Sequence, residues 1–200
     1  MFRKTLGLTF GLALLTAVAG AADTYTFGGR AAANSEIGFN IKHWVINMVH
    51  GTFDKFDGTL KYDEKNIEKS KVEVTIDAAS INTRNEMRDR HLRSADFFDV
   101  EKNPTLTFKS TKVTKASEGS SLAVTGDLSI RGVTKSVVLD VTINGKSEDQ
   151  KGNVLFGFKA TTKINRMDFG VAWNMKNKTG AAKLADEVEI VIMGEAELKK

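Results

Sequence analysis

The sequence predicts an all-β protein, an antiparallel barrel of about eight strands with one short inserted helix near residues 84–94. Three observations lead to this prediction. Apolar and polar residues alternate with a period of two through most of the chain. Turn signals separate the alternating stretches at short intervals, which favours hairpins and an up-and-down barrel over a sandwich. One charged stretch has helical spacing instead.

The alternating stretches each present one apolar and one polar face, as strands of antiparallel sheets do. Phe53 and Phe56 are three residues apart in an apparent strand, which predicts a β-bulge near Asp54-Lys55. The clearest turn signals are Asp57-Gly58, Arg131-Gly132, Asn144-Gly145 and Lys151-Gly152-Asn153. The clearest alternating stretches are 37–41, 72–76, 122–130, 137–143, 154–158 and 188–192.

The predicted helix begins with a capping box, because Thr83 precedes Glu86 by three residues. Opposite charges four residues apart predict the pairs Glu86–Arg90 and Asp89–Arg93 along it. A single charged helix in an all-β chain, followed by the aromatic pair at 97–98, predicts a lid, a plug or an end cover on the barrel.

The first residues predict a cleaved export signal spanning 1–21, with 1–22 as the alternative. Arg3 and Lys4 precede an apolar stretch too short to span a bilayer comfortably, and Ala19-Gly20-Ala21 is an A-x-A cleavage site. We therefore expect an exported mature single domain over 22–200 that does not span a membrane.

Composition excludes several function classes. Without Arg3 and Lys4 the chain has 27 basic and 25 acidic residues, which are scattered along it, so the sequence does not indicate a nucleic-acid binder. It contains no cysteine, so disulfides, thiolate metal sites, covalent haem and thiol nucleophiles are excluded. The core alone must therefore hold the exported fold.

The chain shows no catalytic or metal-binding pattern. It has no Gly-x-Ser-x-Gly, no His-Glu-x-x-His and no phosphate-binding glycine loop. His43, His50 and His91 lack the short spacing of metal ligands. We expect no enzyme activity, no metal and no cofactor.

Several long motifs in order resemble the YceI-like family of bacterial periplasmic proteins. The resemblance implies a lipocalin-like eight-stranded barrel with a deep apolar tunnel for a long polyisoprenoid or other lipid, whose head lies near the mouth. It also leaves a homodimer open. The motifs are residues 38–43 (GFNIKH), 51–58 (GTFDKFDG), 80–83 (SINT), 88–98 (RDRHLRSADFF), 104–110 (PTLTFKS), 126–135 (GDLSIRGVTK), 165–170 (NRMDFG) and 185–188 (ADEV).

Strand parity then predicts the apolar lining of the barrel interior. Candidate contacts for a polar head group are His91, Arg88, Arg93 and Arg166, since guanidinium suits phosphate. The alternative for these arginines is structural: the helix pairs given above, and an ion pair of Arg166 with Asp168. The predicted lining residues are Phe39, Ile41, Val74, Ile76, Leu106, Phe108, Leu128, Leu139, Phe156, Phe158 and Ile190.

Two functions fit these residues. One is a periplasmic carrier that holds a long apolar chain, such as an isoprenoid, a quinone-like lipid or a fatty acid or amide. The other is a filled barrel that acts in envelope stress through surface contacts, without a dedicated ligand. Periodicity cannot separate them, because eight strands enclose either packed side chains or one small ligand. Five aromatic and thioether side chains near strand ends are expected either at the barrel mouth or in the core: Trp44, Trp173, Met48, Met167 and Met175.

Overall fold

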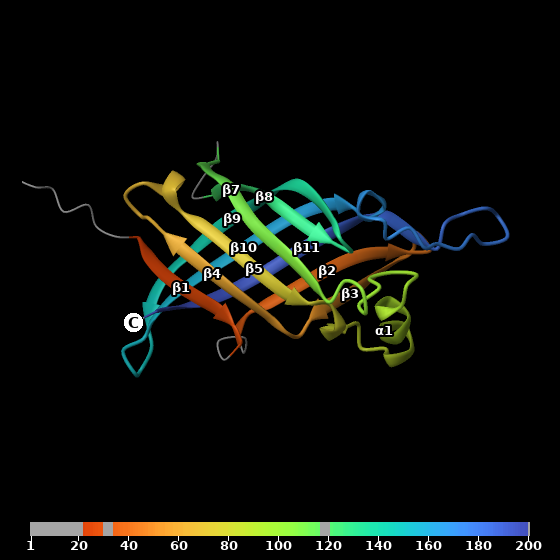
Figure 1. Ribbon diagram of the computed structural model, residues 1–200, viewed down its shortest axis with the longest axis horizontal. Helices are drawn as coiled ribbons and strands as arrows, with labels where there is room; N and C mark the ends of the chain where they lie inside the picture. The colour runs from red at the N-terminus through yellow and green to blue at the C-terminus, as the bar shows by residue number, and fades with distance from the viewer. Residues whose placement is uncertain (1–21, 30–33, 117–120, 200) are drawn as a thin grey trace, which may run out of the picture.

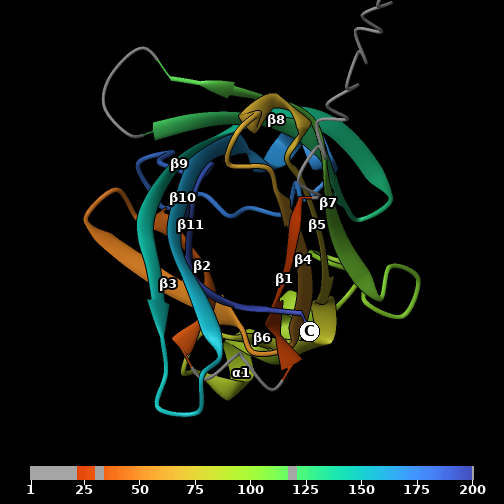
Figure 2. The ribbon, with the colours of Figure 1, turned by 90° about the vertical axis from the view of Figure 1, so that its left-hand side faces the viewer.

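The computed structural model describes residues 22–29, 34–116 and 121–199, and these form one antiparallel sheet closed into a barrel (Figure 1). Figure 2, along the barrel, shows the strands arranged around its axis. The strands are β1 (Asp23–Gly28), β2 (Glu36–His43), β3 (Asn47–Phe53), β4 (Phe56–Tyr62), β5 (Lys71–Asp77), β6 (Ile81–Asn82), β7 (Thr105–Lys115), β8 (Ser121–Ile130), β9 (Val133–Glu148), β10 (Val154–Asn165) and β11 (Leu184–Leu198). The helices are α1 (Glu86–Arg93) and the single-turn segments η2 (Ile67–Lys69), η3 (Ala78–Ser80) and η4 (Arg166–Phe169).

The eleven strand segments make eight walls. β2 pairs with β3 while β1 pairs with β4, so β1 and β2 form one wall and β3 and β4 the next. β5 and β6 form the third wall, because they pair with β4 and β3 respectively. β11 pairs with β10 on one side and with β2 and β1 on the other, which closes the ring. The predicted eight-stranded antiparallel barrel with one short helix is confirmed.

The prediction of a β-bulge near Asp54-Lys55 is wrong, because a break between two strands lies there instead. These two residues interrupt the wall between β3 and β4 instead of forming an extra residue within one strand. The backbone N–H groups of Asp54 and Lys55 donate to Ser80 at 3.1 Å, to its carbonyl and its hydroxyl respectively. This two-residue corner restores parity, so that Phe53 and Phe56 are both buried.

Helix α1 begins two residues later than the sequence predicted, because its N-cap is Asn85 and not Thr83. The side chain of Asn85, not that of Thr83, accepts the N–H of Arg88 at 3.0 Å. Thr83 is buried, and its hydroxyl and its N–H both donate to the buried carboxylate of Asp89. The hydrogen bonds to Asp89, six residues further along the chain, therefore occupy the side chain that the capping pattern assigned to the cap.

One of the two predicted helix ion pairs forms. Glu86 and Arg90 approach to 3.7 Å on the exposed face. The predicted Asp89–Arg93 pair is wrong: Arg93 donates instead to the carbonyls of Ala79 at 2.7 Å and Ile81 at 2.8 Å. These bonds tie α1 to the β5–β6 wall, at the end of the barrel where Figure 1 shows the helix.

Phenylalanine rings lie across glycines of the neighbouring strand inside the barrel. A Cβ on Gly58 would lie 2.2 Å from the ring of Phe27, and one on Gly194 would lie 2.1 Å from the ring of Phe158. The absence of a Cβ therefore lets these rings lie flat against the wall, as in the pairing of aromatics with strand glycines. Two further pairs are Phe39 over Gly51 and Phe108 over Gly126.

The substitution Gly58→Ala is expected to destabilise the protein by about 1–3 kcal/mol, because the added methyl group displaces the Phe27 ring. Urea unfolding measures the change. Gly157→Ala is the matched control: a Cβ there meets Asn144 at an ordinary 3.4 Å. It should change stability by less than about 1 kcal/mol. Equal losses in the two variants would contradict the account.

Candidate functional site

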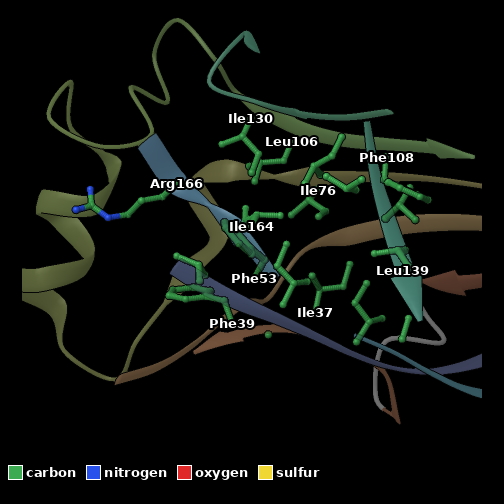
Figure 3. Close-up of a pocket in the computed structure, with 18 of the residues that line it drawn as sticks. Ile37, Phe39, Phe53, Ile76, Leu106, Phe108, Ile130, Leu139, Ile164 and Arg166 are labelled. Atoms are coloured by element: carbon green, nitrogen blue, oxygen red, sulfur yellow. The ribbon is translucent and has the colours of Figure 1, made fainter. Parts of the chain in front are cut away.

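The barrel encloses a cavity of about 720 Å³ lined by side chains from every wall. Ile37, Ile76, Leu106 and Leu139 are among the apolar side chains along its length in Figure 3, and Arg166 lies at the end beside α1. Several inward residues are only half-buried because they face this space: Val137, Val141 and Ile143 on β9. The barrel interior is therefore hollow.

All eleven apolar residues predicted from parity line this cavity. Parity alone could have found further lining residues on the same faces. Others come from connections, where no period identifies them. The missed strand residues include Phe27, Ile37, Val49, Phe53, Leu60, Val72, Val113, Leu122, Val124, Ile130, Val137, Val141, Ile143, Ala160, Ile164, Val188 and Ile192, and those missed between strands include Ile67, Leu92, Phe97, Phe98, Phe169 and Trp173.

Among the residues that the structure describes, the cavity lining contains cationic side chains and no carboxylate. Arg88, Lys183 and His43 gather at the α1 end, while Lys71 lies at the opposite end, at the start of β5. Burial lowers the pKa of His43 from its ordinary value, and the positive charges of Lys183 and Arg88 lower it further. This end of the cavity is therefore electropositive and suits an anionic or polar group.

Arg88 and His91, two of the predicted head-group residues, line the cavity from α1. Arg88 donates from Nε to the Thr83 hydroxyl at 2.7 Å and from Nη2 to the Thr83 carbonyl at 2.8 Å. His91 lies 2.8 Å from the carboxylate of Asp96 and edge-on to the ring of Trp173. Both side chains are thus held in position at the α1 end of the cavity, which we call the mouth because the exposed Met87 of α1 lines the cavity there.

Arg93 does not line the cavity, since its guanidinium faces the β5–β6 wall described above. The hydrogen bonds from Nε and Nη2 to backbone carbonyls give this side chain a structural role at the edge of α1.

Arg166 lines the cavity but is engaged by the protein itself. Its guanidinium is buried and donates to the carbonyls of Ala185 at 2.9 Å, Trp173 at 3.0 Å and Val171. The predicted ion pair with Asp168 is wrong; the carboxylate partner is Asp186, at 3.4 Å. Burial lowers the pKa of the guanidinium, and Asp186 partly offsets this. Arg166 thus joins the β10–β11 connection to the start of β11.

Within residues 22–29, 34–116 and 121–199, no group of three His, Cys, Asp or Glu side chains is placed to hold a metal ion. His50 instead lies 2.9 Å from the side-chain oxygen of Asn40 on the outer face of the wall. Over the same ranges, no helix has the length and apolar character needed to cross a membrane.

Comparison with known proteins identifies a family and a shared fold. The model of the YceI-like domain matches residues 30–196. A UPF0312 protein of Serratia proteamaculans is 42% identical over 193 residues, covering 96% of each chain. The crystal structure of a Campylobacter jejuni YceI protein is 36% identical, with a TM-score of 0.69 over 80% of this chain and 90% of that one.

A more distant structural neighbour shares the fold alone. It is described as a polyisoprenoid binding domain from Saccharophagus degradans, implicated in plant cell wall breakdown. Its sequence is 13% identical, and the TM-score is 0.58 over 89% of this chain and 99% of that one.

Proposed function

The chain belongs to the YceI-like family, and from that premise we propose that it is a carrier that holds one long apolar lipid chain inside its barrel. The observation that carries the proposal is the hollow interior, about 720 Å³ and lined almost wholly by aliphatic and aromatic side chains. This volume falls within the roughly 300–1,000 Å³ of sites that enclose one small molecule. The alternative, a barrel filled by its own side chains, does not account for this cavity.

The physical driving force is the removal of methylene groups from water. Each buried CH₂ contributes about 0.8 kcal/mol, so a long chain binds tightly without polar contacts along its length. The ligand class we propose is an isoprenoid, a quinone-like lipid or a fatty acid or amide. The polyisoprenoid-binding description of the distant neighbour favours the isoprenoid within this class.

The polar head of the lipid lies at the α1 end in this proposal. Arg88 and Lys183 contribute two positive charges there, and Lys71 one at the other end. The guanidinium of Arg88 is already oriented by Thr83, which reduces the entropy lost when it binds an anionic head. Arg166 is a positioning residue, because its donors are taken by backbone carbonyls.

The double variant Arg88→Gln with Lys183→Gln is expected to bind geranylgeranyl diphosphate about tenfold or more weakly, since each charged hydrogen bond contributes about 1.5–3 kcal/mol. Binding of geranylgeraniol, which has the same apolar chain, should change little. Lys42→Gln with Arg84→Gln is the matched control, because both side chains are exposed and neither lines the cavity. Equal weakening for both lipids would contradict the proposed orientation. Isothermal titration calorimetry measures the affinities of wild type and both double variants for the two lipids.

We propose that the protein works in the periplasm, after export directed by residues 1–21. That leader lies outside the described residues, so the proposal rests on its sequence pattern and on the resemblance stated above. The intact mass of the exported chain tests it: cleavage after residue 21 or 22 is expected, and a mass that retains the leader contradicts it.

The proposed activity is binding without chemistry. Native mass spectrometry of protein purified from a bacterial periplasm, followed by solvent extraction, tests it directly. One long-chain lipid per protein chain is expected. A protein that is empty and also refuses added geranylgeraniol and hexadecanoic acid would support the alternative, an envelope interaction protein without a dedicated ligand. Conversion of the bound lipid during incubation would contradict the non-enzymatic assignment.

A further inference from the structure

The most exposed large apolar side chains of the described residues gather at the cavity mouth. Ile46 is 87% exposed, Met87 74% and Val45 73%. Val45 and Ile46 form the tip of the β2–β3 hairpin, and Met87 belongs to α1 and lines the cavity. Figure 1 shows this hairpin, α1 and the β10–β11 connection at the same end of the barrel.

The hairpin tip has a backbone that its residues disfavour. Trp44 and Val45 have φ angles of 52° and 64°, in the left-handed region. Hairpin turns of this kind prefer Asn-Gly or Asp-Gly, and a β-branched residue at positive φ is an outlier. Trp44 and Val45 therefore adopt a backbone conformation that glycine or asparagine would adopt more readily, and this turn exposes Val45 and Ile46. Such local strain points to function.

The tip is joined to a lysine-rich connection. The N–H of Trp44 donates to the carbonyl of Lys183 at 2.7 Å, and the N–H of Lys183 donates to the carbonyl of Met175 at 2.7 Å. Residues 42–48 and 171–184 contain no acidic residue and four lysines: Lys42, Lys176, Lys178 and Lys183.

Three carboxylates on α1 and beside these segments are engaged by basic side chains: Glu86 by Arg90, Asp96 by His91 and Asp186 by Arg166. The mouth therefore combines exposed apolar side chains with an excess of positive charge. Two copies of this face would repel each other, whereas an anionic lipid surface complements both properties.

We propose that this end of the barrel docks onto an anionic lipid bilayer. Val45 and Ile46 enter the head-group region, Met87 contacts it, and Lys176 and Lys178 pair with lipid phosphates. The cavity mouth then faces the membrane, which is the geometry that moving an apolar chain between bilayer and barrel requires. This inference goes beyond the proposed function, since docking needs no lipid in the cavity.

Vesicle flotation of the full mature chain tests the docking, with phosphatidylcholine vesicles alone or containing about 30% phosphatidylglycerol. Wild-type protein should float with the anionic vesicles. The variant Val45→Ser with Ile46→Ser should bind them about tenfold or more weakly. The matched control, Val138→Ser with Met193→Ser, removes two side chains that are about half exposed on the barrel wall, at 49% and 48%. It should bind like wild type.

Charge is tested separately on the same vesicles. Lys176→Gln with Lys178→Gln should weaken binding to anionic vesicles about thirtyfold, since each lysine contributes about fivefold near such a surface. Lys65→Gln with Lys151→Gln, exposed residues in turns at the other end of the barrel, should have a much smaller effect.

The proposal is overturned if wild-type protein fails to float with anionic vesicles, or if the tip variant binds as tightly as wild type. A dimer that the tip variant dissociates, in sedimentation velocity without vesicles, would assign the surface to a second copy instead. Circular dichroism confirms that each variant is folded. Native mass spectrometry of the cavity lipid is independent of all these outcomes, so a failure of docking is distinguishable from a failure of the carrier function.

Discussion

Val141→Trp is expected to weaken the binding of geranylgeraniol and hexadecanoic acid at least about 100-fold while leaving the barrel folded. Val141 lies on β9, pairs with Leu122 and Ala160 of the flanking strands, and faces the cavity. Its side chain is half-buried because open space lies in front of it. The larger indole therefore occupies the space of the ligand. Excluding about four methylene groups at about 0.8 kcal/mol each accounts for a loss of this size.

Val138→Trp is the matched control for this experiment. It lies three residues earlier on the same strand, on the outer face, and is 49% exposed. The same indole on that face leaves the cavity unchanged, so lipid binding should be that of wild type. Titration with the two lipids measures affinity, and native mass spectrometry measures the lipid that co-purifies. A Val141→Trp protein that still carries one lipid per chain would show that the ligand lies elsewhere.

Arg166→Met is expected to lower the free energy of unfolding by about 3–5 kcal/mol, because the buried guanidinium is the shared donor to three backbone carbonyls. The methionine matches much of the apolar stem but removes every donor. The carbonyls of Val171, Trp173 and Ala185 then lose their partner, and an unsatisfied buried polar group costs about 1–3 kcal/mol. The loss should be similar over neutral pH, because an arginine side chain stays charged there.

Arg90→Gln is the control for the Arg166 experiment. Arg90 makes one exposed ion pair with Glu86, so its loss should cost less than about 0.5 kcal/mol. Urea unfolding monitored by tryptophan fluorescence measures both variants, since Trp173 lies in the segment that Arg166 holds. If the free energy of unfolding of Arg166→Met lies within about 1 kcal/mol of the wild-type value, the hydrogen bonds from Arg166 to these carbonyls do not stabilise the β10–β11 connection.

The face of the sheet on which each side chain lies was predictable from the sequence, because successive side chains of a strand point to opposite faces whichever strand it pairs with. Leu128, Leu139 and Phe156 could therefore be assigned to the interior before their neighbours were known, and all three line the cavity. The existence of α1 was predictable for a similar reason, since its charge spacing is local. Residues of the connections, such as Trp173, follow no period, and their place at the mouth could not be predicted.

The wrong side-chain partners were assigned where local spacing offered more than one candidate. Thr83 and Asn85 are both good caps, and the buried carboxylate of Asp89 decided between them by taking the Thr83 hydroxyl. Asp168 was the nearest acid to Arg166 along the chain, but the turn before β11 brings Asp186 to it. Local spacing cannot rank such partners, because their distance depends on how the strands close.

The fold class and the set of inward-pointing side chains follow from the sequence, because alternation is a property of each strand alone. Whether those side chains meet across the barrel does not follow from it. That depends on the circumference of the closed ring of eight walls, completed by the pairing of β11 with β1 and β2. Since glycines let several phenylalanine rings lie flat against the walls, the centre stays open for a ligand.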